Sequence, residues 1–270
     1  MFCPPKGLLL VLLVIAFVPV PALASSDLYR AKTIVTGQRE ETRIPGFSKC
    51  LEDVLVKVSG DPALIGGPKA AGVTAQARKF VSKYRYRDRL EGLPIHDEQG
   101  SRDRPYDLTV DFVPEKVDDA LRALGRTPWT APRPVLMILL SVRNDTIKYV
   151  LASDGRYGID QRESLAAAAW QMGMPLVLPS EAVLQDTGLT FESLPAAKPQ
   201  ELKKLASGGA LPLVGRLVWN RGTLGWAAEW RLEWNDKTYQ WRIKDVNFDD
   251  AFRSAMRGAA QIASGNGTPE

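Results

Sequence analysis

The side chains best suited to acid–base chemistry in this chain are one histidine and two aspartates. His96, the single histidine, lies in a polar segment that also contains Asp97 and Glu98. Asp107 and Asp111 alternate with apolar residues, and this alternation predicts a strand whose polar side carries both carboxylates. Because carboxylates and imidazoles move protons during hydrolysis, Asp107, Asp111 and His96 are the residues that a hydrolase would use.

The surroundings of these residues favour a simpler interpretation. A catalytic base is held rigidly by its neighbours, whereas the neighbours of His96 are solvent-seeking. With Thr109 between them, Asp107 and Asp111 are typical of the polar side of a half-buried strand. The sequence lacks the G-x-S-x-G, S-x-x-K, H-E-x-x-H and phosphate-loop motifs, and one histidine with two cysteines is a poor set for zinc. We therefore predict no enzyme activity, no catalytic, cofactor-binding or metal-binding residues, and no cofactor.

The first 24 residues have the pattern of a secretory signal peptide. Lys6 precedes an apolar run over residues 8–18, and Ala22-Leu23-Ala24 supplies a small-residue cleavage site. The run is shorter than the roughly 20 residues that cross a bilayer as a helix, so we expect cleavage after Ala24, with an uncleaved anchor as the alternative. Ser25 stands where a lipoprotein would have its cysteine, so no lipid anchor is expected.

Cleavage would remove Cys3 and leave Cys50 alone, which excludes a disulfide within the mature chain. Cys50 lies on the apolar stripe of a predicted helix, so we expect it to be buried, with pairing between two chains as the alternative.

The region after the leader predicts two small αβ domains in tandem. Pro128, Pro132 and Pro134 favour an extended connector, and we place the boundary near Ala131. The predicted divisions are a signal peptide over residues 1–24, an N-terminal domain over 25–131, a C-terminal domain over 132–263 and a disordered tail over 264–270.

Hydrophobic periodicity predicts the elements of both domains. The first half is expected to contain strands at 28–35 and 106–112, helices at 47–58, 73–84 and 115–124, and a polar, mobile segment at 88–104. In the first of these helices, Pro45 is expected in the first turn and Gly60 at the end. The second half is expected to contain strands at 135–142, 147–151 and 176–178, helices at 161–172, 200–206 and 248–262, and a three-stranded meander at 213–219, 223–234 and 237–243. The fold class is therefore α+β, and the second sheet is mainly antiparallel.

The meander is rich in tryptophan. Its middle strand places Trp226, Trp230 and Trp234 on one side. We interpret this side as a core face covered by the helices at 161–172 and 248–262, because both helices need an apolar platform. A stacking surface for a glycan, a peptide or a partner protein is the alternative.

Composition narrows the possible partners. The 270 residues are 45% hydrophobic and 24% charged, which indicates a packed globular protein, and the net charge is only +4. Because the charges are interspersed, no nucleic-acid partner is expected. Arg85 and Arg87 either serve recognition or line an edge strand, and we favour the edge strand.

Several segments resemble a bacterial family known as domain of unknown function 2066. The segments that carry the resemblance are residues 54–61, Tyr84-Arg85-Tyr86, 106–112, Pro132-Arg133-Pro134 and 213–217, followed by Trp226 and Trp230. The resemblance spans nearly the whole mature chain and implies an exported protein of the periplasm, without catalytic residues to transfer. The second half is also similar in element order to small αβ domains of the Tol translocation protein and of lipoprotein activators of cell-wall synthases.

These observations predict a periplasmic, non-catalytic binding or scaffolding module of the cell envelope. Its partner would be an envelope protein or a peptidoglycan-associated component, and the membrane would be met only through the transient signal peptide. The alternative is an envelope-acting hydrolase that uses carboxylates.

Overall fold

The computed structural model of the chain describes residues 25–93 and 103–270. The predicted signal peptide and His96 lie outside these residues. The described chain contains two antiparallel or mixed sheets with helices packed on them, which confirms the α+β class.

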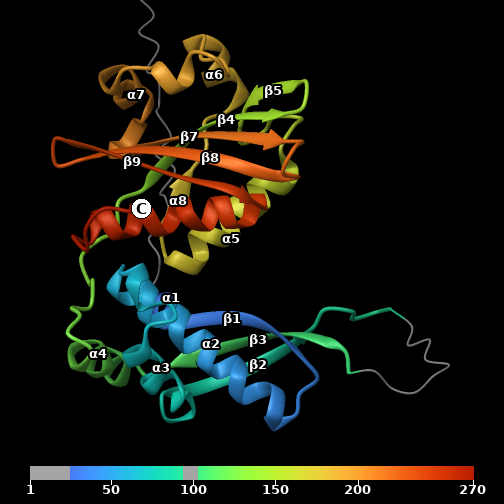
Figure 1. Cartoon of the computed structure of the whole chain (residues 1–270), viewed down its shortest axis with the longest axis vertical. Helices are drawn as coiled ribbons and strands as arrows, with labels where there is room; N and C mark the ends of the chain where they lie inside the picture. Colours follow the sequence, from blue (N-terminus) through green and yellow to red (C-terminus); the bar gives the residue numbers. More distant parts are fainter. Residues whose placement is uncertain (1–24, 94–102) are drawn as a thin grey trace, which may run out of the picture.

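The first sheet has three antiparallel strands in the order β1-β3-β2. β3 confirms the strand that the alternation around Asp107 and Asp111 predicts, and it lies in the centre of the sheet. A long helix, α2, crosses one face of this sheet (Figure 1). The elements of this half are α1 (Ser25–Leu28), β1 (Arg30–Thr36), α2 (Glu40–Ser59), α3 (Pro68–Thr74), β2 (Val81–Asp88), β3 (Pro105–Phe112) and α4 (Pro114–Ala123), with short 3-10 turns at Pro62–Leu64 and Ala77–Lys79.

The helix α2 forms where the apolar spacing predicts it. Its stripe, which includes Cys50, Leu51 and Val54, is buried against the sheet, and Gly60 ends the helix in the left-handed conformation with φ of 73°. The helix begins earlier than expected, at Glu40, so Pro45 lies inside the helix and beyond its first turn.

The predicted helix over residues 73–84 is wrong. In its place the chain forms α3, a 3-10 turn and the strand β2, which pairs with β3 along its whole length. The apolar residues before Tyr84 fit a helical period, but Tyr84-Arg85-Tyr86-Arg87 alternates as a strand does. A helix would satisfy its own backbone groups but would leave one edge of β3 unpaired, whereas β2 pairs with that edge, so the tertiary context decides the outcome.

The second sheet is built around β4, which is buried along seven consecutive residues as a central strand should be. Its strands follow the order β5-β4-β7-β8-β9, with β6 beside the start of β4. β4 pairs in parallel with β6 and β7, and the other pairs are antiparallel. The elements are β4 (Leu136–Asn144), β5 (Ile147–Val150), α5 (Ile159–Met172), β6 (Leu176–Val177), α6 (Glu181–Thr187), α7 (Pro199–Leu205), β7 (Leu211–Asn220), β8 (Gly225–Trp234), β9 (Lys237–Val246) and α8 (Phe248–Ala263), with 3-10 turns at Leu194–Ala196 and Ser207–Gly209.

The meander and the three predicted helices of this half are confirmed, and α6 is an additional helix that the sequence analysis missed. Its signals are present in the sequence, because the Ser180 side chain accepts a hydrogen bond from the backbone N–H of Val183 and Gly188 ends the helix in the left-handed conformation.

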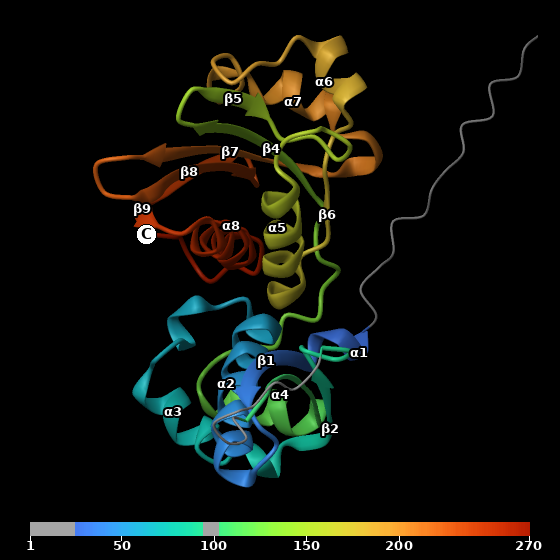
Figure 2. The same cartoon turned by 90° about the vertical axis from the view of Figure 1, so that its right-hand side faces the viewer.

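Helices cover both faces of the second sheet. α5 and α8 lie on the face directed toward the first sheet, and α6 and α7 lie on the opposite side (Figure 2). The middle of the tryptophan face is core: Trp226, Trp230 and Trp241 are buried, and Trp230 meets Phe252 of α8 edge to face at 6.3 Å between ring centroids. The core interpretation is therefore correct for these rings.

The two halves share one continuous buried core. Arg133 of the connector donates hydrogen bonds to the carbonyls of Lys57 and Met172, and Asn266 donates one to the carbonyl of Ser59. The beginning of the predicted tail thus contacts the first half, and the division into two domains stays a prediction.

Cys50 is fully buried, and burial raises the pKa of its thiol to about 12. Within the described ranges, no helix is both long and apolar enough to span a bilayer.

Candidate functional site: a cationic sheet face

The most distinctive surface of the described chain is the face of the first sheet that points away from α2. Strand register places side chains of β1, β3 and β2 in rows across this face. One row contains Arg30, Asp111 and Lys83, and the next contains Lys32, Thr109 and Arg85. A third contains Ile34, Asp107 and Arg87, and Arg89 extends β2 beside Pro105. We call this surface the cationic face, defined by Arg30, Lys32, Lys83, Arg85, Arg87 and Arg89.

The charges of the cationic face do not cancel. Its six cations meet three carboxylates, Asp107 and Asp111 on the face and Asp27 beside Arg30, which leaves +3. Strand pairing therefore brings together on one sheet face cations that are scattered along the sequence.

Both carboxylates on the face are held between arginines. Asp111 accepts a hydrogen bond from Nε of Arg30 at 2.5 Å, and the guanidinium of Arg85 lies 3.8 Å from it. Asp107 accepts two hydrogen bonds from Arg87, at 2.5 and 3.1 Å, and Arg89 lies 3.7 Å away. The carboxylates therefore fix the positions of the arginine side chains and neutralise only part of their charge.

The cationic face is open to solvent in the described chain. The side chains of Lys83, Arg85 and Arg87 are 60–72% exposed, whereas those of Asp107 and Asp111 beneath them are nearly buried. Exposed cations above buried carboxylates keep their outward N–H groups free for an external anion.

A hollow of about 360 Å³ lies at one end of this face. It is lined by Arg30, Lys32, Arg85 and Thr109 of the sheet and by Trp170 of α5. The indole of Trp170 comes from the second half of the chain and also lies 4.4 Å from the ammonium of Lys57. The hollow thus joins three cations and one aromatic ring at the junction of the two halves.

The structure places two of the three predicted hydrolase residues. Asp107 and Asp111 share a face as expected, but they are four positions apart along the strand, which is roughly 14 Å at about 3.4 Å per residue. Paired carboxylates that hydrolyse glycosides lie about 5–9.5 Å apart. Both are engaged by arginines instead of facing each other across an empty space. His96 lies outside the described residues.

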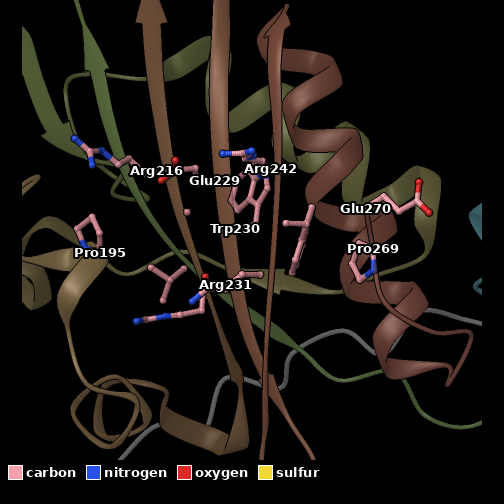
Figure 3. A pocket seen from close by; sticks show the side chains of 12 residues that line it. Pro195, Arg216, Glu229, Trp230, Arg231, Arg242, Pro269 and Glu270 are labelled. Carbon is pink, nitrogen blue, oxygen red and sulfur yellow. The ribbon is translucent and has the colours of Figure 1, made fainter.

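A second hollow, of about 640 Å³, lies at the second sheet (Figure 3). Pro195, Arg216 and Arg231 lie on one side of the strands, whereas Pro269 and Glu270 lie on the other side, next to α8. Its lining residues therefore straddle the sheet and do not converge on one point. Across residues 25–93 and 103–270, no cluster of three or more histidine, cysteine or acidic side chains could hold a metal ion.

Sequence reasoning identified Asp107 and Asp111, and it named Arg85 and Arg87 as residues of either a recognition site or an edge strand. β2 is an edge strand, as that prediction favoured, but the cationic face as a whole was missed. The signal was available: Lys83, Arg85, Arg87 and Arg89 alternate with other residues, as a strand with one cationic face requires. The helix predicted over residues 73–84 ended where this alternation begins, so sequence reasoning did not extend a strand over residues 81–88.

Comparison with known proteins identifies a different family from the predicted one. Residues 22–130 match the sequence model of a family described as a domain of unknown function (DUF8605). The predicted resemblance to domain of unknown function 2066 over nearly the whole chain is therefore wrong. The matched segment is less than half of the chain, and it contains all six residues of the cationic face. No curated protein matches the chain. No solved structure matches it either, so the similarity in element order to envelope αβ domains gains no support.

Proposed function

We propose that the protein is a non-catalytic binding module of the cell envelope that recognises an anionic component through the cationic face. The observation that supports this proposal is the excess of six cations over three carboxylates on an exposed sheet face. Several cations aligned on one surface attract anionic partners and orient them before contact.

A competing explanation is protection of the sheet edges. β1 and β2 are edge strands, and charged residues on such strands discourage pairing with other chains. One or two charges are enough for that purpose, and side chains in a strand project to its faces rather than sideways toward a new strand. Edge protection therefore does not account for cations at every row of the face.

Replacement of three exposed cations tests the proposal. We expect the variant Lys83→Gln/Arg85→Gln/Arg87→Gln to bind heparin, a soluble polyanion, about 100-fold more weakly, because three lost ion contacts of roughly 1 kcal/mol each amount to about 3 kcal/mol. Fluorescence titration at two salt concentrations measures the affinity and its salt dependence. The matched variant Lys237→Gln/Arg242→Gln/Lys244→Gln removes three charges from the exposed strand β9 and should bind as the wild type does.

Removal of a negative charge from the cationic face is a control for the effect of charge on binding. Asp107→Asn removes a carboxylate from the same face at nearly constant shape and should strengthen heparin binding by a factor of about 2 to 5. Equal losses in the β9 variant and the β2 variant, or no heparin binding by the wild type, would contradict the proposal.

We further propose that the chain reaches the periplasm after removal of residues 1–24, as the leader pattern indicates. The intact mass of protein recovered from the periplasmic fraction should then correspond to a chain that begins at Ser25. Recovery from the cytosol with Met1 attached would show that this localisation is wrong.

A further inference from the structure

We propose that the anionic partner of the cationic face is the surface of an acidic phospholipid bilayer, on which the first sheet lies flat. This inference rests on the proposed function and names the partner of the same site. It follows from the chemistry of the exposed side chains on and beside the face.

Aliphatic side chains are exposed at the end of the sheet where β2 leads toward β3. Ile34 lies on the cationic face, in the row of Asp107 and Arg87, and is 55% exposed. Leu90 and Leu93 lie just beyond the end of β2 and are 37% and 59% exposed. Large aliphatic residues next to cations are typical of surfaces that rest on a bilayer, because the cations meet the headgroups while the aliphatic groups enter the acyl boundary.

The geometry of the face suits a planar partner. The cations of β1 and β2 lie on either side of β3, so they are separated by two strand spacings, about 10 Å. Along β2, successive cations are two residues apart, about 7 Å. This spacing presents separate positive charges over an area and not in one deep pocket, as contact with many lipid headgroups requires.

A nucleic acid fits this surface less well. Proteins that bind single strands place aromatic rings where bases can stack. The aromatic residues of β2, Tyr84 and Tyr86, lie in the rows of Val110 and Leu108, on the α2 side of the sheet. A single half-buried ring, that of Trp170, lines the hollow at one end of the cationic face, and it already lies against the ammonium of Lys57. The strongly exposed apolar residues Ile34 and Leu93 are aliphatic. Lipid is therefore the partner that the combination of charge and side-chain type favours.

Co-sedimentation of the mature chain, Ser25 to Glu270, with vesicles tests the inference without the apolar leader. We expect binding to vesicles of phosphatidylglycerol mixed with phosphatidylcholine, and little binding to phosphatidylcholine alone. The variant Lys83→Gln/Arg85→Gln/Arg87→Gln should lower the partition coefficient by about 100-fold, whereas the matched β9 variant Lys237→Gln/Arg242→Gln/Lys244→Gln should leave it within about twofold of the wild type.

A second variant separates lipid insertion from charge. Ile34→Ser should lower vesicle partitioning by about tenfold and leave heparin affinity unchanged, because it removes an aliphatic group and no charge. Heparin binding without vesicle binding would overturn the lipid inference and leave the proposed function intact. Absence of both would overturn both. Tighter binding to a single-stranded oligonucleotide than to acidic vesicles at the same salt concentration would also overturn the lipid inference.

Discussion

Trp230→Ala is expected to lower the free energy of unfolding by about 3 to 5 kcal/mol, the largest effect of any single substitution that we predict. Trp230 is 2% exposed at the centre of β8, where its ring lies against Phe252 of α8 and over Gly215 of β7. Removing the indole leaves a cavity between the sheet and the helix, since the backbone of three paired strands cannot collapse into it. Urea unfolding followed by circular dichroism measures the loss.

Substitution of Gly215 tests whether packing of the Trp230 ring is the cause of the expected destabilisation. A Cβ atom on Gly215 would lie 2.2 Å from the Trp230 ring, so Gly215→Ala should destabilise the wild type by overpacking. In the Trp230→Ala background the same change should cost less, because the ring that it strikes is gone. Equal effects in the two backgrounds would show that Trp230 and Gly215 do not pack as described.

Much of this core is predictable from sequence because a strand has a fixed period. Alternation over residues 226–234 places the tryptophans on one side, and two amphipathic helices require such a platform. At the two ends of the strand, alternation does not predict which side chains are buried. Leu224 belongs by alternation to the same side but lies in the preceding turn and is 76% exposed. Trp234, at the last position, is half-buried.

The first sheet shows why the remainder is harder to predict. The segment before Tyr84 satisfies a helical period, and the alternating segment after it satisfies a strand period. Only the pairing with β3 decides between them, and β3 begins more than 15 residues beyond the end of β2. Local periodicity contains no information about that pairing.

The cationic face depends on the same non-local pairing. Arg30, Arg85 and Asp111 are far apart in the sequence, and their contact follows from the register of three strands. In the linear sequence these charges look interspersed, so net charge and charge runs gave no sign of an anion-binding surface. The carboxylates and the arginines of β2 were each recognisable from alternation within their own segments, but the contacts between them follow only from strand pairing.

The second large effect concerns Lys57, a cation buried where the two halves meet. Its ammonium donates hydrogen bonds to the carbonyls of Arg30, at 2.7 Å, and Asp27, at 3.3 Å, and it lies over the ring of Trp170. Burial, and secondarily the positive charge of Arg133, lower the pKa of Lys57 from 10.5 to about 8; the carboxylates of Asp53 and Asp27 oppose this shift only in part.

This lowered pKa makes the stability of the protein depend on pH in the alkaline range. Between about pH 8 and about pH 10.5 the unfolded chain holds a proton on Lys57 that the folded chain has released. The free energy of unfolding must therefore rise with pH across this window, and the contribution is constant below it, where both states are protonated. From about pH 7 to about pH 10 the expected gain from Lys57 is about 2 to 3 kcal/mol.

Comparison with Lys57→Met isolates this contribution, because methionine keeps a similar apolar length and does not titrate. Groups remote from residue 57 contribute the same pH dependence to both proteins, so their effects cancel in the difference. Burial raises the pKa of the Cys50 thiol to about 12, and although the charge of Lys57 also influences this pKa, the thiol stays protonated in both folded proteins up to about pH 10. The free energy of unfolding of the wild type, minus that of the variant, should rise by about 2 to 3 kcal/mol between about pH 7 and about pH 10 in urea titrations. A difference that stays constant, or that falls with pH, would mean that Lys57 keeps an ordinary pKa, and hence that the junction of the two halves is open to water.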